Sequence, residues 1–207
     1  MNYKWLNLEK NHKLIVFFNG WGMDESIIKH LNSEDFDLLM FYDYNSLKLD
    51  FDFNTLNSYK EVYLIAWSMG VMIGTLFAKF IKAPIKSTIA INGTLKPIDN
   101  KFGIHPKIYD LTINGFNQNS CLKFIASMFN NENNILEINR DYNNQYSELI
   151  ELKNYKSDEN FCYNKIYISD NDKIIPTKSQ VNYWKIEPNL KGGHCPFFDF
   201  KKWSELL

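Results

Sequence analysis

The chain has 207 residues, of which 45% are hydrophobic and 16% aromatic, and its formal net charge is −1. This length and apolar content suffice for one sizeable core, so we expect a single domain spanning residues 1–207. The near-zero charge argues against a nucleic-acid-binding protein, which would need a basic surface to neutralise phosphates.

The chain shows no targeting or membrane signal. Its first ten residues lack the apolar core of a signal peptide, and no window approaches the roughly 20 apolar residues that span a bilayer. Cys121, Cys162 and Cys195 have no metal-ligand spacing and suit reduced thiols. We therefore expect a soluble, cytoplasmic protein that binds no metal, contacts no membrane and is a monomer.

Short apolar runs alternate with helical patterns in the first part of the chain. Residues 13–18 and 36–42 predict buried strands, and Asp24 is placed to cap a helix that reaches Leu31. Residues 61–67 predict a third strand. This alternation favours a mostly parallel sheet wrapped by helices.

The strand pattern continues, but it is interrupted once. Residues 71–81 predict a helix, and residues 87–92 and 165–169 predict further strands, with a last one at 183–187. The intervening sequence is Asn-rich, aromatic and charged, and it is too long for a plain loop. We expect a helical cap inserted at about residues 95–163.

Residues 66–70 read AWSMG and place Ser68 between a predicted strand and a predicted helix. Serine often caps helices. A sharp strand-turn-helix with small residues two before and two after the serine also raises its hydroxyl above the sheet edge, where a base can reach it. Ala66 stands where glycine is commonest, but alanine is small enough. Ser68 is our candidate nucleophile.

His194 is the candidate base. It follows Gly192 and Gly193 in a loop beyond the last predicted strand, from which an imidazole can reach a neighbouring strand. The chain order serine, acidic residue, histidine is one in which such catalytic groups occur. The remaining histidines lack this setting and are interpreted as surface or core residues; they are His12, His30 and His105.

Three aspartates are candidates to orient the histidine. Asp170 and Asp172 follow the predicted strand 165–169, and active-site groups of parallel sheets gather at the carboxyl ends of strands. Asp170 also suits a turn cap, and Asp99, which follows the preceding strand, is a weaker third candidate. The spacing of these residues leaves the choice open.

The loop at residues 19–22, NGWG, follows the first predicted strand and is a candidate oxyanion hole. Glycine lets such a loop turn tightly enough for its amides to point at a ligand. The backbone N–H groups of Trp21 and of Met69, which directly follows Ser68, are the predicted donors.

Beyond these single features, the chain resembles α/β-hydrolases over nearly its whole length, and more closely the BioG-type pimeloyl-[acyl-carrier protein] methyl ester esterases of biotin synthesis. The stretches that carry the resemblance are FNGWGM (18–23), YDY (42–44), AWSMGV (66–71), INGTLKPID (91–99) and GIHP (103–106). The elbow around Ser68 is shared by many hydrolases, whereas the last two stretches are more particular.

The resemblance implies an α/β-hydrolase fold and the hydrolysis of a methyl ester on a pimeloyl chain carried by acyl carrier protein. The segment DKIIP looks like the acid loop of α/β-hydrolases and selects Asp172. Ser68 would then attack the ester, His194 would take and return the proton, and Asp172 would hold the imidazole. No metal or organic cofactor is implied.

An acidic carrier protein needs a basic docking surface. Residues 96–123 carry a net charge of +2, against −3 for residues 124–165. We therefore expect the carrier to dock on the earlier part of the cap, at Lys96, Lys101, Lys107 and Lys123. Trp21 and Trp67 flank the predicted catalytic atoms and are candidates to bind the substrate.

Two other functions compete with this interpretation. An acyl thioesterase or a broad small-ester esterase would use the same machinery on another substrate. A non-catalytic module that binds acyl groups or proteins would share only the fold. Such a module has no need of a serine, an aspartate and a histidine at these positions.

Overall fold

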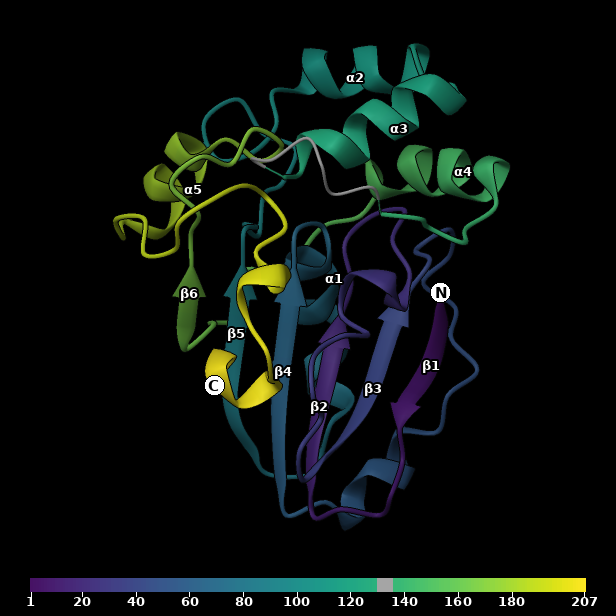
Figure 1. Cartoon of the computed structure of the whole chain (residues 1–207), viewed down its shortest axis with the longest axis vertical. Helices are drawn as coiled ribbons and strands as arrows, with labels where there is room; N and C mark the ends of the chain where they lie inside the picture. Colours follow the sequence, from purple (N-terminus) through teal and green to yellow (C-terminus); the bar gives the residue numbers. More distant parts are fainter. Residues whose placement is uncertain (130–135) are drawn as a thin grey trace.

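The structure is a computed structural model that describes residues 1–129 and 136–207. Within these ranges the chain forms a six-stranded sheet in the order β1-β3-β2-β4-β5-β6 (Figure 1). The strands are β1 (Asn2–Asn7), β2 (Lys13–Phe18), β3 (Phe36–Tyr42), β4 (Glu61–Trp67), β5 (Ile85–Ile91) and β6 (Lys165–Tyr167).

The five strands from β2 to β6 are parallel, as the apolar runs predicted. In the centre of the sheet, Phe18 at the end of β2 pairs with Phe41 on β3 and with Ala66 on β4. Residues 14–18 are completely buried because both faces of β2 are covered. This register brings the carboxyl ends of the central strands to one edge of the sheet.

Strand β1 was not predicted from the sequence. It is antiparallel to β3, with Asn2 opposite Tyr42 and a register shift between Trp5 and Asn7. As an edge strand it keeps Tyr3 and Lys4 exposed. Its sequence, NYKWLN, is therefore too polar to show the continuous apolar run of a central strand.

Each face of the sheet carries its own hydrophobic core. Helix α1 (Gly70–Phe77), continued by η3 (Ala78–Phe80), confirms the helix predicted at residues 71–81 and packs on one face. The other face is closed by η1 (Glu25–Ile27), η4 (Phe197–Asp199) and η5 (Trp203–Leu206). Figure 1 shows α1 and the C-terminal segment on opposite sides of the strands.

Among the described residues between β5 and β6, the chain forms three helices: α2 (Pro106–Asn114), α3 (Gln118–Ser127) and α4 (Tyr142–Leu152). Figure 1 shows them together beyond the carboxyl ends of the strands. Side chains cap each of them at the N-terminus, from His105, Asn117 and Asp141 respectively. We propose that residues 95–163 form a helical cap on a single domain.

Two predicted elements are wrong. Residues 183–187 are not a strand, because helix α5 (Thr177–Trp184) occupies this part of the chain and Lys185 ends it in a left-handed conformation. Val181 and Trp184 lie three residues apart, on one face of the helix, and pack on the core. In so short an apolar segment, the spacing of a helix and the alternation of a strand cannot be told apart.

The second error concerns the helix expected from Asp24 to Leu31. Asp24 does cap a helical turn by accepting the backbone N–H of Ser26, but only the short η1 forms. Ile27, Ile28 and Leu31 are buried as the pattern indicated. Burial of a few apolar residues therefore did not require a full helix here.

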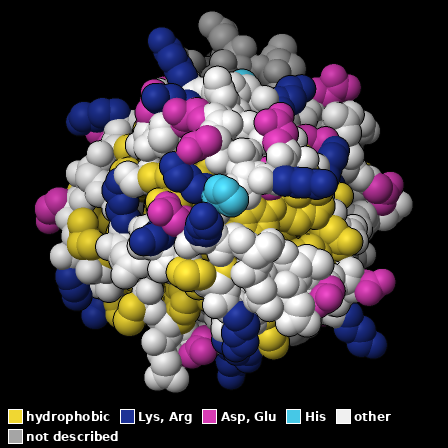
Figure 2. All heavy atoms as spheres, turned by 90° about the horizontal axis from the view of Figure 1, so that it is seen from below, with side chains coloured by type: hydrophobic (Ala, Val, Ile, Leu, Met, Phe, Trp, Pro, Cys, Tyr) yellow, Lys and Arg dark blue, Asp and Glu magenta, His cyan; other side chains and the backbone are white. Residues whose placement is uncertain are grey.

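The opposite end of the molecule from the three cap helices contains η2 (Phe53–Ser58). Figure 2 views the molecule from this end and shows basic, acidic and hydrophobic side chains interspersed. Within the described ranges, no helix combines the length and the apolar character needed to cross a membrane.

Candidate active site

Ser68 lies at the sharp turn between β4 and α1. Its backbone φ is +57°, in the left-handed region that residues other than glycine rarely adopt. Gly70 permits the turn, because a Cβ there would lie 2.3 Å from the backbone oxygen of Phe18 on β2. The turn holds Ser68 at the carboxyl end of the sheet.

His194 reaches Ser68 from the loop that precedes η4. The hydroxyl Oγ of Ser68 lies 2.8 Å from Nε2 of His194 and donates its hydrogen bond to that nitrogen. The backbone carbonyl of His194 accepts hydrogen bonds from Nε1 of Trp67 at 2.8 Å and from Nδ2 of Asn92 at 2.9 Å. Two side chains from neighbouring strands thus fix the loop that carries the imidazole.

Asp172 completes the line of hydrogen bonds. Nδ1 of His194 donates to Oδ2 of Asp172 at 2.7 Å, while Oδ1 accepts the backbone N–H groups of Ile174 and Ile175 at 2.9 and 3.1 Å. Nε2 of Gln180, on α5, is a further donor to Oδ2 at 2.8 Å. The carboxylate therefore accepts hydrogen bonds at both oxygens.

The two alternative aspartates lie elsewhere. Asp170 forms an ion pair with Lys191 at 2.8 Å and accepts the N–H of Gly192. Asp99 accepts the backbone N–H groups of Lys101 and Phe102 in a turn. Of the three candidate acids, only Asp172 contacts His194.

The three side chains form a buried relay. Ser68, His194 and Asp172 are only 5%, 1% and 5% exposed. A hydroxyl bonded to a neutral imidazole can transfer its proton as it attacks a carbonyl carbon, and the carboxylate stabilises the imidazolium that forms. Because the relay is shielded from water, these interactions are stronger than at the surface.

The two residues predicted to supply oxyanion donors, Trp21 and Met69, line the same cavity as Ser68. Within the described part of the chain, neither of their backbone N–H groups donates a hydrogen bond to another residue. They are thus available to a negatively charged oxygen, as an oxyanion hole requires.

Helix α4 holds the loop that contains Trp21. Gln145 donates from Nε2 to the backbone oxygen of Gly22 at 2.8 Å, and its own backbone oxygen accepts Nε1 of Trp21 at 2.9 Å. Glu148 accepts the N–H groups of Gly22 at 3.2 Å and Tyr44 at 3.0 Å. The loop is therefore bound through both sides of Gly22.

Arg140 balances the buried carboxylate of Glu148. Its Nη2 lies 2.9 Å from Oε2 of Glu148 and 3.2 Å from Oδ1 of Asp43. Burial raises the pKa of Glu148, while the neighbouring guanidinium and the Tyr44 N–H oppose that rise. This charged network links α4 to the residues that follow β3.

The cavity above Ser68 has a volume of about 140 Å³ and a largely apolar wall. The residues that line it come from the sheet edge, the cap and the Asp172 loop: Gly20, Trp21, Trp67, Ser68, Met69, Ile104, Ile108, Tyr109, Thr112, Phe124, Met128, Leu149, Lys173, Ile174 and His194. Both tryptophans expected to bind the substrate are among them. A small apolar ester group is a chemical match for this wall.

The four lysines expected to dock a carrier have different surroundings. Lys96 forms an ion pair with Glu159 at 3.2 Å. Lys101 lies over the ring of Phe102, Lys107 is exposed in the first turn of α2, and Lys123 lines a groove on α3 beside Phe116. The four lysines thus belong to different segments: Lys96 and Lys101 precede α2, Lys107 is in α2 and Lys123 is in α3.

The remaining histidines have structural roles where their contacts are defined. His105 caps α2 by accepting the N–H of Lys107 at 3.2 Å, and His30 bonds to the backbone oxygen of Phe197 and stacks on Phe198. Across residues 1–129 and 136–207, no group of three or more His, Cys, Asp or Glu side chains is arranged to hold a metal ion.

Several residues around the site were missed by the sequence reasoning. Asn92 lies in the stretch INGTLKPID and was assigned no role, yet it bonds both to the His194 loop and to Ser169. Gln145 and Glu148 contact Gly22, which is 123 and 126 positions away in the chain, and Gln180 contacts Asp172, which is 8 positions away. The sequence offered one signal for Asn92, which is a polar residue at the end of a buried strand. It offered no signal for Gln145, Glu148 or Gln180.

Comparison with known proteins places the chain in a family. A family model described as pimeloyl-ACP methyl esterase BioG matches residues 1–206. An uncharacterized protein of Haemophilus influenzae is 32% identical over 218 residues, which cover 100% of this chain and 99% of that protein. A malonyl-[acyl-carrier protein] O-methyltransferase of Bacteroides fragilis is 37% identical over 179 residues, 83% of this chain; the chain spans only 36% of that protein's length.

Solved structures agree with this placement. The crystal structure of BioG from Haemophilus influenzae superposes with a TM-score of 0.87 at 30% identity and covers 100% of this chain and 99% of that one. A hydrolase from Oleispira antarctica, at 11% identity and a TM-score of 0.63, covers 95% of this chain and 89% of that one and shows the shared fold. The chain therefore has the α/β-hydrolase fold and belongs to the pimeloyl-ACP methyl esterase BioG family.

Proposed function

We propose that this protein is a serine carboxylic ester hydrolase that converts the methyl ester of pimeloyl-acyl carrier protein to pimeloyl-acyl carrier protein and methanol in biotin synthesis. The observation that carries the proposal is the buried relay of Ser68, His194 and Asp172 beneath a small apolar cavity. Membership of the BioG family supports the choice of substrate.

The geometry suits acyl transfer through a covalent intermediate. Oγ of Ser68 attacks the ester carbonyl carbon as Nε2 of His194 takes its proton, and the N–H groups of Trp21 and Met69 stabilise the oxyanion. The imidazolium then protonates the departing methoxide, which leaves as methanol. A water then attacks the acyl-enzyme as it gives a proton to His194, and His194 returns that proton to Oγ of Ser68 as the bond to the acyl group breaks, which releases the carboxylic acid and free Ser68. This sequence requires no metal or organic cofactor.

The methyltransferase name of one relative does not favour methyl transfer here. The chain aligns with 36% of that protein, which leaves most of its length to carry the named activity. A relay of serine, histidine and aspartate matches the requirements of ester cleavage. A methyltransferase that acts on a carrier-bound acid forms the type of bond that we expect this site to cleave.

The expected partner is an acyl carrier protein. Its bound acyl chain would enter the cavity between α2 and the sheet edge, where Trp21 and Trp67 lie. The lysines of the early cap, Lys96, Lys101, Lys107 and Lys123, are the proposed docking residues, and an acidic carrier would complement their charge. A monomeric, cytoplasmic enzyme without a nucleic-acid or membrane partner remains our prediction.

The direct test uses the purified protein with pimeloyl-carrier methyl ester and follows the carrier by mass spectrometry. We expect the wild type to remove the methyl group while the acyl chain stays on the carrier, and Ser68→Ala to reduce the rate at least 10³-fold. A serine-directed fluorophosphonate should label the wild type and leave Ser68→Ala unlabelled.

The alternatives give other results in the same assay. A thioesterase would release the whole acyl chain from the carrier. A non-catalytic binding module would form no fluorophosphonate adduct and leave the substrate unchanged. A wild type that leaves the methyl ester intact but cleaves unrelated small esters would identify a broad esterase and contradict the proposed substrate.

A further inference from the structure

Gln180 is a completely buried polar residue beside the catalytic acid of the proposed relay. It lies on α5, and its Nε2 is 2.8 Å from Oδ2 of Asp172. The same oxygen accepts the hydrogen bond from Nδ1 of His194 at 2.7 Å. One carboxylate oxygen therefore has a donor from the imidazole and a donor from α5.

The orientation of the Gln180 amide follows from its neighbours. Nε2 also donates to the backbone oxygen of Ile175 at 2.7 Å. The reverse orientation would place Oε1 against two oxygen atoms and lose both hydrogen bonds. With Nε2 directed at its acceptors, Oε1 is buried without a hydrogen-bond partner among the described residues.

An unpartnered buried carbonyl is unfavourable, and an unbranched apolar side chain at position 180 would avoid it. The hydrogen bond from Nε2 to the carboxylate of Asp172 offsets the cost of the unpartnered carbonyl, because a hydrogen bond to a charged acceptor is stronger than one to a neutral acceptor. The polar character of this residue is thus tied to Asp172.

We infer that Gln180 is a positioning residue, which holds Oδ2 of Asp172 toward His194. This inference rests on the proposed function for its catalytic consequence. The N–H groups of Ile174 and Ile175 hold Oδ1, so Gln180 supplies the only side-chain donor besides His194 among the described contacts of this carboxylate. Gln180 and His194 thus both bind the oxygen that faces the imidazole.

The experiment replaces Gln180 with methionine, which keeps the length of the side chain and removes its donor. We expect Gln180→Met to lower kcat on the methyl ester about tenfold with KM unchanged. This loss is only a fraction of the rate enhancement that a positioned general base contributes. The proton NMR signal of His194 Nδ1–H, assigned by its loss in Asp172→Ala, should move upfield, because its hydrogen bond weakens when Oδ2 is no longer held.

Thr75→Val is the matched control. Thr75 is 1% exposed on α1, and its hydroxyl accepts the N–H of Asp158 and donates to the backbone oxygen of Met72. Its replacement also removes buried hydrogen bonds, but away from the relay. We expect it to lower thermal stability while the NMR signal stays in place and kcat remains within twofold of the wild type.

An unmoved Nδ1–H signal in Gln180→Met, or an equal kcat loss in Thr75→Val, would overturn the inference. The NMR signal is measured on the resting protein. Its shift therefore decides the role of Gln180 even if the wild type hydrolyses no methyl ester, an outcome that would contradict the proposed function alone.

Discussion

Two residues with nucleophilic atoms lie close to the imidazole of His194, and their surroundings differ. Ser68 lines the cavity and bonds directly to Nε2. Cys195 follows His194 in the chain but belongs to the hydrophobic core on the far side of the relay, and burial raises the pKa of its thiol to about 12. A thiol in this environment stays protonated at neutral pH, so the serine is the group suited to attack a substrate.

The difference predicts a pattern of cysteine alkylation. At pH 8 a thiol with a pKa of about 12 is ionised in only about one molecule in 10⁴. Cys121 is also buried with a raised pKa, whereas Cys162 is exposed. We expect iodoacetamide to modify only Cys162 in the folded protein, without loss of esterase activity, and mass spectrometry to identify the site.

The control is the same reaction in denaturant, where Cys121, Cys162 and Cys195 should all be modified because burial no longer protects them. Modification of Cys195 in the folded protein at a rate similar to that of Cys162 would show that its thiol is accessible, and this outcome would contradict the proposed division between a reactive serine and an inert cysteine.

At the scale of elements, helix α4 is a structural part of the site as well as of the cap. Gln145 and Glu148, three residues apart, place their side chains on the same side of the helix and bind both the carbonyl and the N–H of Gly22. Trp21, whose N–H is the proposed oxyanion donor, is the preceding residue. The position of α4 therefore sets the position of this donor.

The buried Glu148 predicts a pH-dependent stability. Its pKa is raised above the ordinary value of 4.5 chiefly by burial, so the folded state holds the proton more tightly than the unfolded chain. The stability due to this group is complete below about pH 4.5 and is lost as the pH rises through the folded-state pKa. Glu148→Gln does not titrate and escapes this loss.

We expect Glu148→Gln to be less stable than the wild type by about 2 kcal/mol at low pH, because its amide nitrogen cannot accept the backbone N–H of Gly22 or Tyr44 as a carboxyl oxygen does. The gap in unfolding free energy should narrow as the pH rises from 4.5 to 7, as measured by chemical denaturation. Glu187→Gln, at an exposed position, is the control and should show a constant gap. A gap for Glu148→Gln that widens with pH would contradict the prediction.

The elements that were predicted correctly are those whose own amino-acid sequence shows which of their faces are buried. The runs that form β2, β3 and β4 are continuous and apolar, since parallel strands are buried on both faces. The edge strand β1 and the half-buried helix α5 lack such a signal, because a neighbouring element decides which of their faces is covered.

The same distinction applies to the site. Ser68 and His194 stand in local patterns, and the choice of Asp172 over Asp170 needed the family resemblance. The contact of Gln145 with Gly22 joins segments that only the folded chain brings together, and the contact of Gln180 with Asp172 depends on how the chain turns into α5. Local sequence therefore indicated the reacting groups, but not the residues that hold them.

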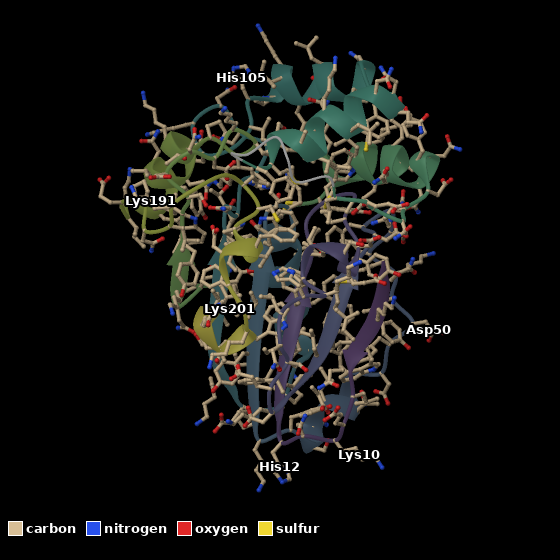
Figure 3. All side chains as sticks on the ribbon, in the orientation of Figure 1. Lys10, His12, Asp50, His105, Lys191 and Lys201 are labelled. Atoms are coloured by element: carbon tan, nitrogen blue, oxygen red, sulfur yellow. The ribbon has the colours of Figure 1, made fainter. Side chains whose placement is uncertain are left out.

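At the scale of the whole molecule, the cavity and the cap occupy one end. Figure 3 shows His105, the residue that caps α2, at this end, and Lys10 and His12 at the opposite end. Ile104 and Ile108, on either side of His105, line the cavity above Ser68. We therefore propose that a carrier protein that delivers an acyl chain to Ser68 binds near the start of α2, where Lys101 and Lys107 are exposed.

This placement predicts the effect of charge reversal. The double variant Lys101→Glu and Lys107→Glu should raise KM for pimeloyl-carrier methyl ester about fivefold to tenfold at low salt, because an acidic carrier loses attraction at its docking surface. The increase should shrink as ionic strength rises, since salt screens exposed charges. Steady-state kinetics with carrier-bound and small methyl esters at two salt concentrations measure both effects.

Lys10→Glu reverses an exposed charge at the far end and is the control for a general charge effect, at half the net-charge change of the double variant. It should leave KM for the carrier-bound substrate within twofold of the wild type. An equal rise in KM for the small ester would indicate a damaged cavity, and an equal rise in Lys10→Glu would indicate a general charge effect. Either result would contradict docking at the start of α2, because a local surface predicts a change confined to one substrate and one end of the molecule.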